Sequence, residues 1–139
     1  MSETLTQRTV RIVLLSAAAA GFLFWYSHHS EVSFADGLRY VREAQLVSRG
    51  DFTGGLWRAI DHPMHALVIS AAHHMIGGGD GPFAWQTAAQ AASVFMLVMA
   101  VAPVYLVTRE LYDETTSVIS CILLFANPII TYVAVNVLS

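Results

Sequence analysis

Most of the residue types that can carry out chemistry lie between residues 28 and 82 of this 139-residue chain. Asp36 opens a segment in which apolar residues recur near helical spacing. Its carboxylate can therefore cap a helix, or it can act as a general base or a cation ligand. Arginines, which suit bidentate phosphate binding, follow at Arg39, Arg42, Arg49 and Arg58. Pairing with nearby acids or with lipid headgroups is the alternative role for these arginines.

Histidines in the same segment form a second candidate site. His62 and His65 are three residues apart, so on a helix they could share a metal ion with Asp61. The spacing fixes no further ligand, and the sequence has no H-E-x-x-H signature. In the alternative interpretation Asp61 caps a short helix, Pro63 takes its first turn, and the imidazole rings lie at a membrane interface.

The composition shows what must position these residues. Apolar residues make up 55% of the chain and charged residues 12%, and the mean hydropathy is +0.55. Soluble domains have about 45–50% apolar and about 25% charged residues, so the chain is expected to lie in a membrane. Seven arginines, no lysine and ten acids exclude a basic nucleic-acid-binding face. A single cysteine, Cys121 in an apolar run, excludes a disulfide framework and predicts inert packing.

Three stretches match the roughly 20 apolar residues that a membrane helix needs: 9–27, 83–107 and 117–137. We therefore expect an all-α integral membrane protein in which residues 28–82 form one long loop. Arg8 and Arg11 place the N-terminus in the cytoplasm and this loop outside it. Residues 64–76 are too short to cross, so we expect them to form a short juxtamembrane helix that is interfacial or re-entrant. If they did cross, every later segment would change sides.

Two further interpretations concern the ends of the chain. Aromatic residues close the first apolar stretch where a cleaved signal peptide would have small residues, so we interpret it as an anchor. The sequence stops at Ser139, where the third predicted helix reaches its surface. We expect residues 1–139 to be a single membrane domain and the N-terminal fragment of a larger polytopic enzyme.

Several short motifs, taken in order, resemble the N-terminal part of the C-type glycosyltransferases. This group includes the protein O-mannosyltransferases and the lipid A aminoarabinose transferases. The similar segments are Phe34-Ala35-Asp36-Gly37-Leu38-Arg39-Tyr40, Arg49-Gly50-Asp51-Phe52, His62-Pro63-Met64, the turn at residues 105–112, and Asn127-Pro128 with Tyr132. The family often has a paired Asp-Glu in its first outer loop, whereas here Gly37 follows Asp36.

This resemblance implies a multi-pass cell-membrane enzyme. It would transfer a sugar from a polyprenyl-phosphate donor to a lipid, glycan or protein acceptor at the extracytoplasmic face. Asp36 matches the family's outer-loop acid, which acts as a general base or helps to hold a divalent cation; no other cofactor is implied. We expect Arg39 and Arg58 to meet the donor phosphate and His62 to shape the substrate cavity.

Two alternatives come from other functional classes. A small non-catalytic membrane protein that packs against partner subunits requires only that Asp36 be a helix cap. A metal-binding or transport subunit requires that His62, His65 and a further ligand converge. The enzyme requires instead that Asp36 face a cavity at the membrane surface.

Overall fold

The computed structural model describes residues 5–29, 35–57 and 62–135. Within these residues all regular structure is helical, which confirms the predicted all-α class. Its elements are α1 (Leu5–Ser27), α2 (Ala35–Ser48), the short π-helix η1 (Thr53–Trp57), α3 (Pro63–Ile76), α4 (Pro82–Leu111), α5 (Glu114–Ala126) and α6 (Pro128–Val135).

Two of these helices, α1 and α4, are long and apolar enough to cross a membrane. They correspond to the first two predicted spans. The third predicted span, residues 117–137, is divided between α5 and α6, and neither part alone has the length of a crossing helix. The division falls at Asn127-Pro128, where proline lacks the N–H that would continue the helix.

The local sequence accounts for the start of α5 and the end of α3. Asp113 caps α5, accepting a hydrogen bond from the Thr116 N–H at 2.7 Å. This hydrogen bonding lowers the pKa of the Asp113 carboxyl below its usual range. α3 ends at Gly77, whose φ of 72° lies in the region that favours glycine. The glycines at 77, 78 and 79 all have positive φ and form the turn between α3 and α4.

The beginnings of α2 and α3 correct two predictions. Asp36 lies inside the first turn of α2, because Ala35 already belongs to the helix, so it is not the N-cap. The N-cap of α3 is His62 rather than Asp61, and it makes no side-chain capping bond. Pro63 does occupy the first turn of α3, as predicted.

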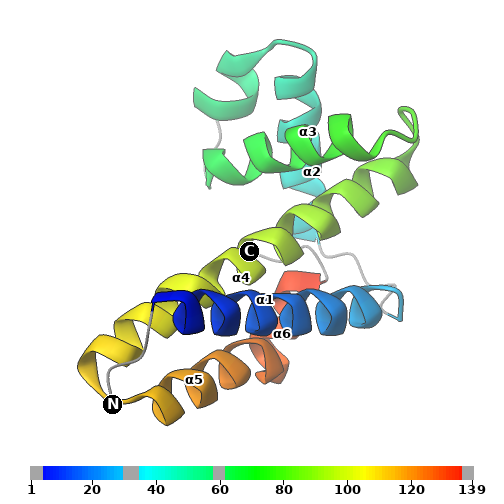
Figure 1. Ribbon diagram of the computed structural model, residues 1–139. Coiled ribbons are helices and arrows are strands. Elements are labelled where there is room, and N and C mark those ends of the chain that lie inside the picture. Colours follow the sequence, from blue (N-terminus) through cyan, green and yellow to red (C-terminus); the bar gives the residue numbers. More distant parts are fainter. Residues whose placement is uncertain (1–4, 30–34, 58–61, 136–139) are drawn as a thin grey trace.

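The helices form two separate hydrophobic cores along α4. We define the α2–α3 region as α2, η1, α3 and residues 82–93, and the α1–α5 region as α1, residues 94–111, α5 and α6. The first region buries Tyr40, Ala44, Val47, Ala66, Ile69, Trp85, Ala89 and Ala92. The second buries Ala19, Val101, Tyr105 and Cys121. Figure 1 shows α2 and α3 gathered near the start of α4, and α5 beside its end.

α4 belongs to both regions because of its length. Its 30 residues make a helix of about 45 Å, whereas the hydrocarbon core of a bilayer is about 30 Å thick. About ten residues therefore lie beyond the length that a bilayer would cover. The first turns of α4 pack against α3 and α2, while its later turns pack against α1 and α5 (Figure 1).

Candidate functional site

A groove lies between α2 and the start of α4 and has a volume of about 280 Å³. This is slightly below the range of roughly 300–1,000 Å³ that is typical of ligand pockets. Apolar side chains form most of its wall, and its polar groups are one guanidinium and two amides. Its lining residues are Gly37, Leu38, Val41, Arg42, Gln45, Pro82 and Gln86.

Arg42 is the cation of this groove. Within the described residues its guanidinium has no hydrogen bond and no ion pair, and its side chain is exposed. Gln45 and Gln86 likewise make no side-chain hydrogen bond to a described residue. A free guanidinium beside two amides can bind a phosphate or the hydroxyl groups of a sugar.

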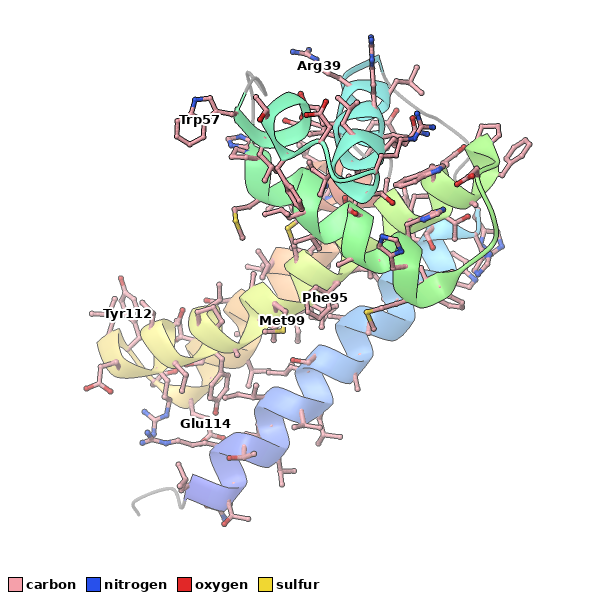
Figure 2. All side chains as sticks on the ribbon, turned by 90° about the horizontal axis from the view of Figure 1, so that it is seen from above. Arg39, Trp57, Phe95, Met99, Tyr112 and Glu114 are labelled. Atoms are coloured by element: carbon pink, nitrogen blue, oxygen red, sulfur yellow. The ribbon has the colours of Figure 1, made fainter. Side chains whose placement is uncertain are left out.

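Helical periodicity could have identified Arg42 from the sequence. Residues 38, 41, 42 and 45 recur at intervals of three and four, so they share one face of α2. Arg39 is not on that face and does not line the groove. It is exposed, and Figure 2 shows it at the outer edge of the molecule.

The other predicted site residues have different positions. Asp36 directly precedes the groove residue Gly37 in the first turn of α2, and its side chain lies outside the described part. Arg58 and Asp61 also lie outside the described residues. His62 is exposed at the N-terminus of α3 and does not line the groove.

His65 is buried where α2, α3 and α4 meet. Its Nε2 lies 3.3 Å from the Ser93 hydroxyl, and its ring packs at 4.8 Å from the ring of Tyr40. Burial lowers the pKa of His65, and the nearby His62 lowers it further. A neutral His65 can accept a hydrogen bond from Ser93, so this pair joins α3 to α4 as a structural contact.

The two remaining histidines of α3 point to different partners. The His73 ring stacks on Trp85 with centroids 3.7 Å apart and planes within 4°, and its Nε2 lies 3.0 Å from the Gly79 carbonyl oxygen. The His74 Nε2 lies 3.2 Å from the Ser48 hydroxyl. These histidines therefore do not converge. Among the described residues, no three His, Cys, Asp or Glu side chains are grouped to hold a metal ion.

Two further buried residues contact a neighbouring helix. Ser93 of α4 does so through His65. Cys121 is fully buried, with its sulfur 3.6 Å from the Val101 carbonyl oxygen, in agreement with the predicted packing role. Neither residue lines the groove between α2 and α4.

Comparison with known protein families, with curated proteins and with solved structures finds no match to this chain. The features that bear on function are therefore the groove, its position at the start of the long apolar helix α4, and the sequence motifs.

Proposed function

We propose that this chain is the N-terminal part of a multi-pass membrane glycosyltransferase that uses a polyprenyl-phosphate sugar. In this proposal the N-terminus is cytoplasmic and the α2–α3 region lies on the extracytoplasmic face. The observation that carries the proposal is the groove between α2 and α4, which has a free guanidinium and lies at the start of α4, one of the two long apolar helices.

The proposed topology has three crossings, of which the third is the broken pair α5 and α6. A break within a membrane helix is tolerated when other groups satisfy the freed backbone atoms. Here the Asn127 side-chain oxygen accepts from the N–H groups of Ile129 and Ile130 at 3.0 and 3.2 Å. The Thr131 hydroxyl donates to the Phe125 carbonyl oxygen at 2.6 Å. These bonds would let α5 and α6 cross together.

The proposed reaction uses two groups of α2. The Asp36 carboxylate removes a proton from the acceptor hydroxyl, whose oxygen then forms a bond to the anomeric carbon of the sugar. The bond between that carbon and the donor phosphate oxygen breaks, and the polyprenyl phosphate leaves with the bonding electrons. Arg42, six residues and about 9 Å along the helix axis from Asp36, binds the departing phosphate. Arg39, Arg58 and a divalent cation remain further candidates for this binding.

The decisive substitution is Asp36→Asn, made in the full natural reading frame that contains these residues. Sugar transfer would be measured from a panel of polyprenyl-phosphate donors in detergent. Loss of a general base is expected to lower turnover by about 10²–10⁴-fold while donor binding persists. The matched control is Asp51→Asn near the other end of α2, because the Asp51 oxygen that caps the Gly54 N–H at 2.8 Å is retained in asparagine.

Equal turnover of wild type and Asp36→Asn would remove Asp36 from the chemistry. Absence of transfer with every donor would favour the second candidate function, a non-catalytic membrane protein that packs against partners. That candidate is supported by the many large apolar side chains exposed on α1, α4 and α5, including Leu14, Phe24, Met99 and Leu123. The two candidates differ in whether the α2–α4 groove binds a phosphate-bearing substrate.

A further inference from the structure

Phe95 and Ala91 of α4 line two grooves at once. One groove lies between α4 and α1 and has a volume of about 360 Å³. The other lies between α4 and α3 and has a volume of about 310 Å³. Phe95 is 56% exposed, and Figure 2 shows it beside α4 in the space toward α1 and the end of α3. The Phe95 side chain therefore stands between two neighbouring grooves.

The groove between α1 and α4 changes in polarity along its length. Ser27, His28, Thr87 and Gln90 line one end, whereas Ala20, Val94 and Val98 line the other. This order follows from the antiparallel packing of the two helices, in which His28 and Thr87 lie near one end and Arg11 pairs with Glu114 at the other. The polar end adjoins the aromatic residues that close α1, a composition typical of the headgroup level of a bilayer.

Two side chains at this polar end have unused hydrogen-bond donors. The Gln90 amide makes no hydrogen bond to another described residue. The His28 ring packs edge-on against Phe24 at 4.5 Å and has no side-chain hydrogen bond within the described part of the chain. By contrast, the Ser27 and Thr87 hydroxyls donate to backbone carbonyl oxygens within their own helices. Gln90 and His28 can therefore donate to phosphate or ester oxygens.

The groove between α3 and α4 has only apolar walls. α3 contributes Val68, Ala71, Ala72, Met75 and Ile76, and α4 contributes Ala92 besides the two shared residues. Met75 is 87% exposed and Ile76 52% exposed, so this end of α3 presents apolar side chains outward. An apolar face of this kind is typical of a helix that lies on the lipid surface.

We propose that one two-chain phospholipid occupies both grooves, with an acyl chain on each side of Phe95 and its phosphate at Gln90 and His28. The graded polarity of the α1–α4 groove matches a headgroup followed by a chain. The second, wholly apolar groove provides a place for a second chain, which a phospholipid has and a polyprenyl phosphate lacks. The inference requires that the chain lies in a membrane, but it does not depend on glycosyl transfer.

Native mass spectrometry of the purified full chain in mild detergent tests this site. The probe is dioleoyl phosphatidylglycerol, titrated against the delipidated protein. Mono-oleoyl lysophosphatidylglycerol, with the same headgroup and one chain, serves as the comparison. We expect one two-chain lipid to bind per protein, about tenfold more tightly than the one-chain lipid, which corresponds to about 1.4 kcal/mol.

Ala91→Trp is the substitution designed to fill both grooves. It is expected to weaken phosphatidylglycerol binding by about tenfold or more, while Leu123→Trp, on an outward-facing position of α5 that is 62% exposed, leaves binding unchanged. Gln90→Leu, which leaves the shared apolar wall intact, provides an independent test and is expected to weaken the preference for phosphatidylglycerol over uncharged diacylglycerol.

Three results would each overturn the inference. They are equal affinity of wild type and a folded Ala91→Trp, equal affinity for one-chain and two-chain lipids, and one-for-one displacement of phosphatidylglycerol by polyprenyl phosphate. The last result would assign the grooves to the sugar donor and would leave the proposed glycosyl transfer standing. The sugar-transfer activity of Asp36→Asn, in turn, does not test phospholipid binding. Each proposal can therefore be contradicted without the other.

Discussion

The core of the α2–α3 region contains large side chains, and Tyr40, Ile69 and Trp85 are at most 3% exposed, whereas Met75 and Phe83 at its surface are more than 80% exposed. In the α1–α5 region large apolar side chains point outward, and Leu14, Phe24 and Leu123 are each more than 60% exposed. The first pattern, a buried core of large side chains, is stabilised by apolar burial. The second is the pattern expected when lipid is the solvent, because lipid removes the penalty for exposed apolar surface.

The two regions also differ in the interactions that hold their helices together. The α2–α3 region combines large apolar contacts with buried imidazoles that join helices. The α1–α5 region has a small core around Tyr105 and Cys121, together with the ion pair Arg11–Glu114 at 2.6 Å. A change in apolar volume should therefore damage the first region more than the second. Three predictions, from the largest expected effect to the smallest, test this difference.

Trp85→Ala should have the largest effect. It removes a 3% exposed ring that stacks on His73 and packs in the core of the α2–α3 region. Truncation of a buried aromatic residue typically costs about 3–5 kcal/mol. Hydrogen exchange in detergent should show loss of protection in α2 and α3 and retained protection in α5. Equal loss of protection in α5 would mean that the two regions unfold as one unit.

A pair of glycine substitutions should distinguish the regions by a smaller amount. A Cβ at Gly55 would lie 2.6 Å from Val47 Cγ2 and 2.7 Å from the Glu43 carbonyl oxygen, so Gly55→Ala should destabilise by about 1–3 kcal/mol. A Cβ at Gly21 in α1 meets nothing within 4 Å, so Gly21→Ala should be neutral or should stabilise by up to about 1 kcal/mol. Equilibrium unfolding of both variants in detergent measures the difference. Similar destabilisation by both would contradict the assigned packing.

Acidification should weaken the α2–α3 region through His65. The pKa of this residue is lowered in the folded chain, whereas in the unfolded chain it is near its ordinary value of 6.5. Stability is therefore fully present above about pH 6.5 and falls as the pH drops from there through the lowered folded pKa, because the unfolded chain then binds more protons. His65→Gln, which keeps an acceptor for Ser93, should flatten this dependence in pH-dependent hydrogen exchange of α3. An unchanged profile would assign the effect to another group.

Local signals in the sequence predict much of this fold. Apolar length identifies α1 and most of α4, and the proline and glycine boundaries identify α3. Two features depend on tertiary contacts and could not be read locally. Trp85 belongs to the core of the α2–α3 region although it lies in a predicted membrane helix, and Gly55 is required by the close approach of η1 to α2.

The candidate site was less predictable than the fold. The choice of Arg39 depended on its position in a motif, whereas the groove is lined by Arg42, which shares a helix face with Leu38 and Gln45. Helical spacing alone would have placed Arg42, and not Arg39, on that face. The division of α5 from α6 was also signalled, by Pro128, but continuous hydrophobicity outweighed it in the predicted span. The groove itself requires α4 beside α2, a contact that no local pattern specifies.

In the proposed topology, α4 carries the α2–α3 region out of the bilayer on one side and ends on the other. The most direct measurement is labelling of single-cysteine variants by a membrane-impermeant maleimide in intact cells, in a Cys121→Ser background. Asp80→Cys, before α4, should react from outside; Tyr112→Cys, after α4, should react only once the membrane is permeabilised; and Leu123→Cys should react in neither case. Reaction of Asp80→Cys and Tyr112→Cys from the same side would contradict this topology.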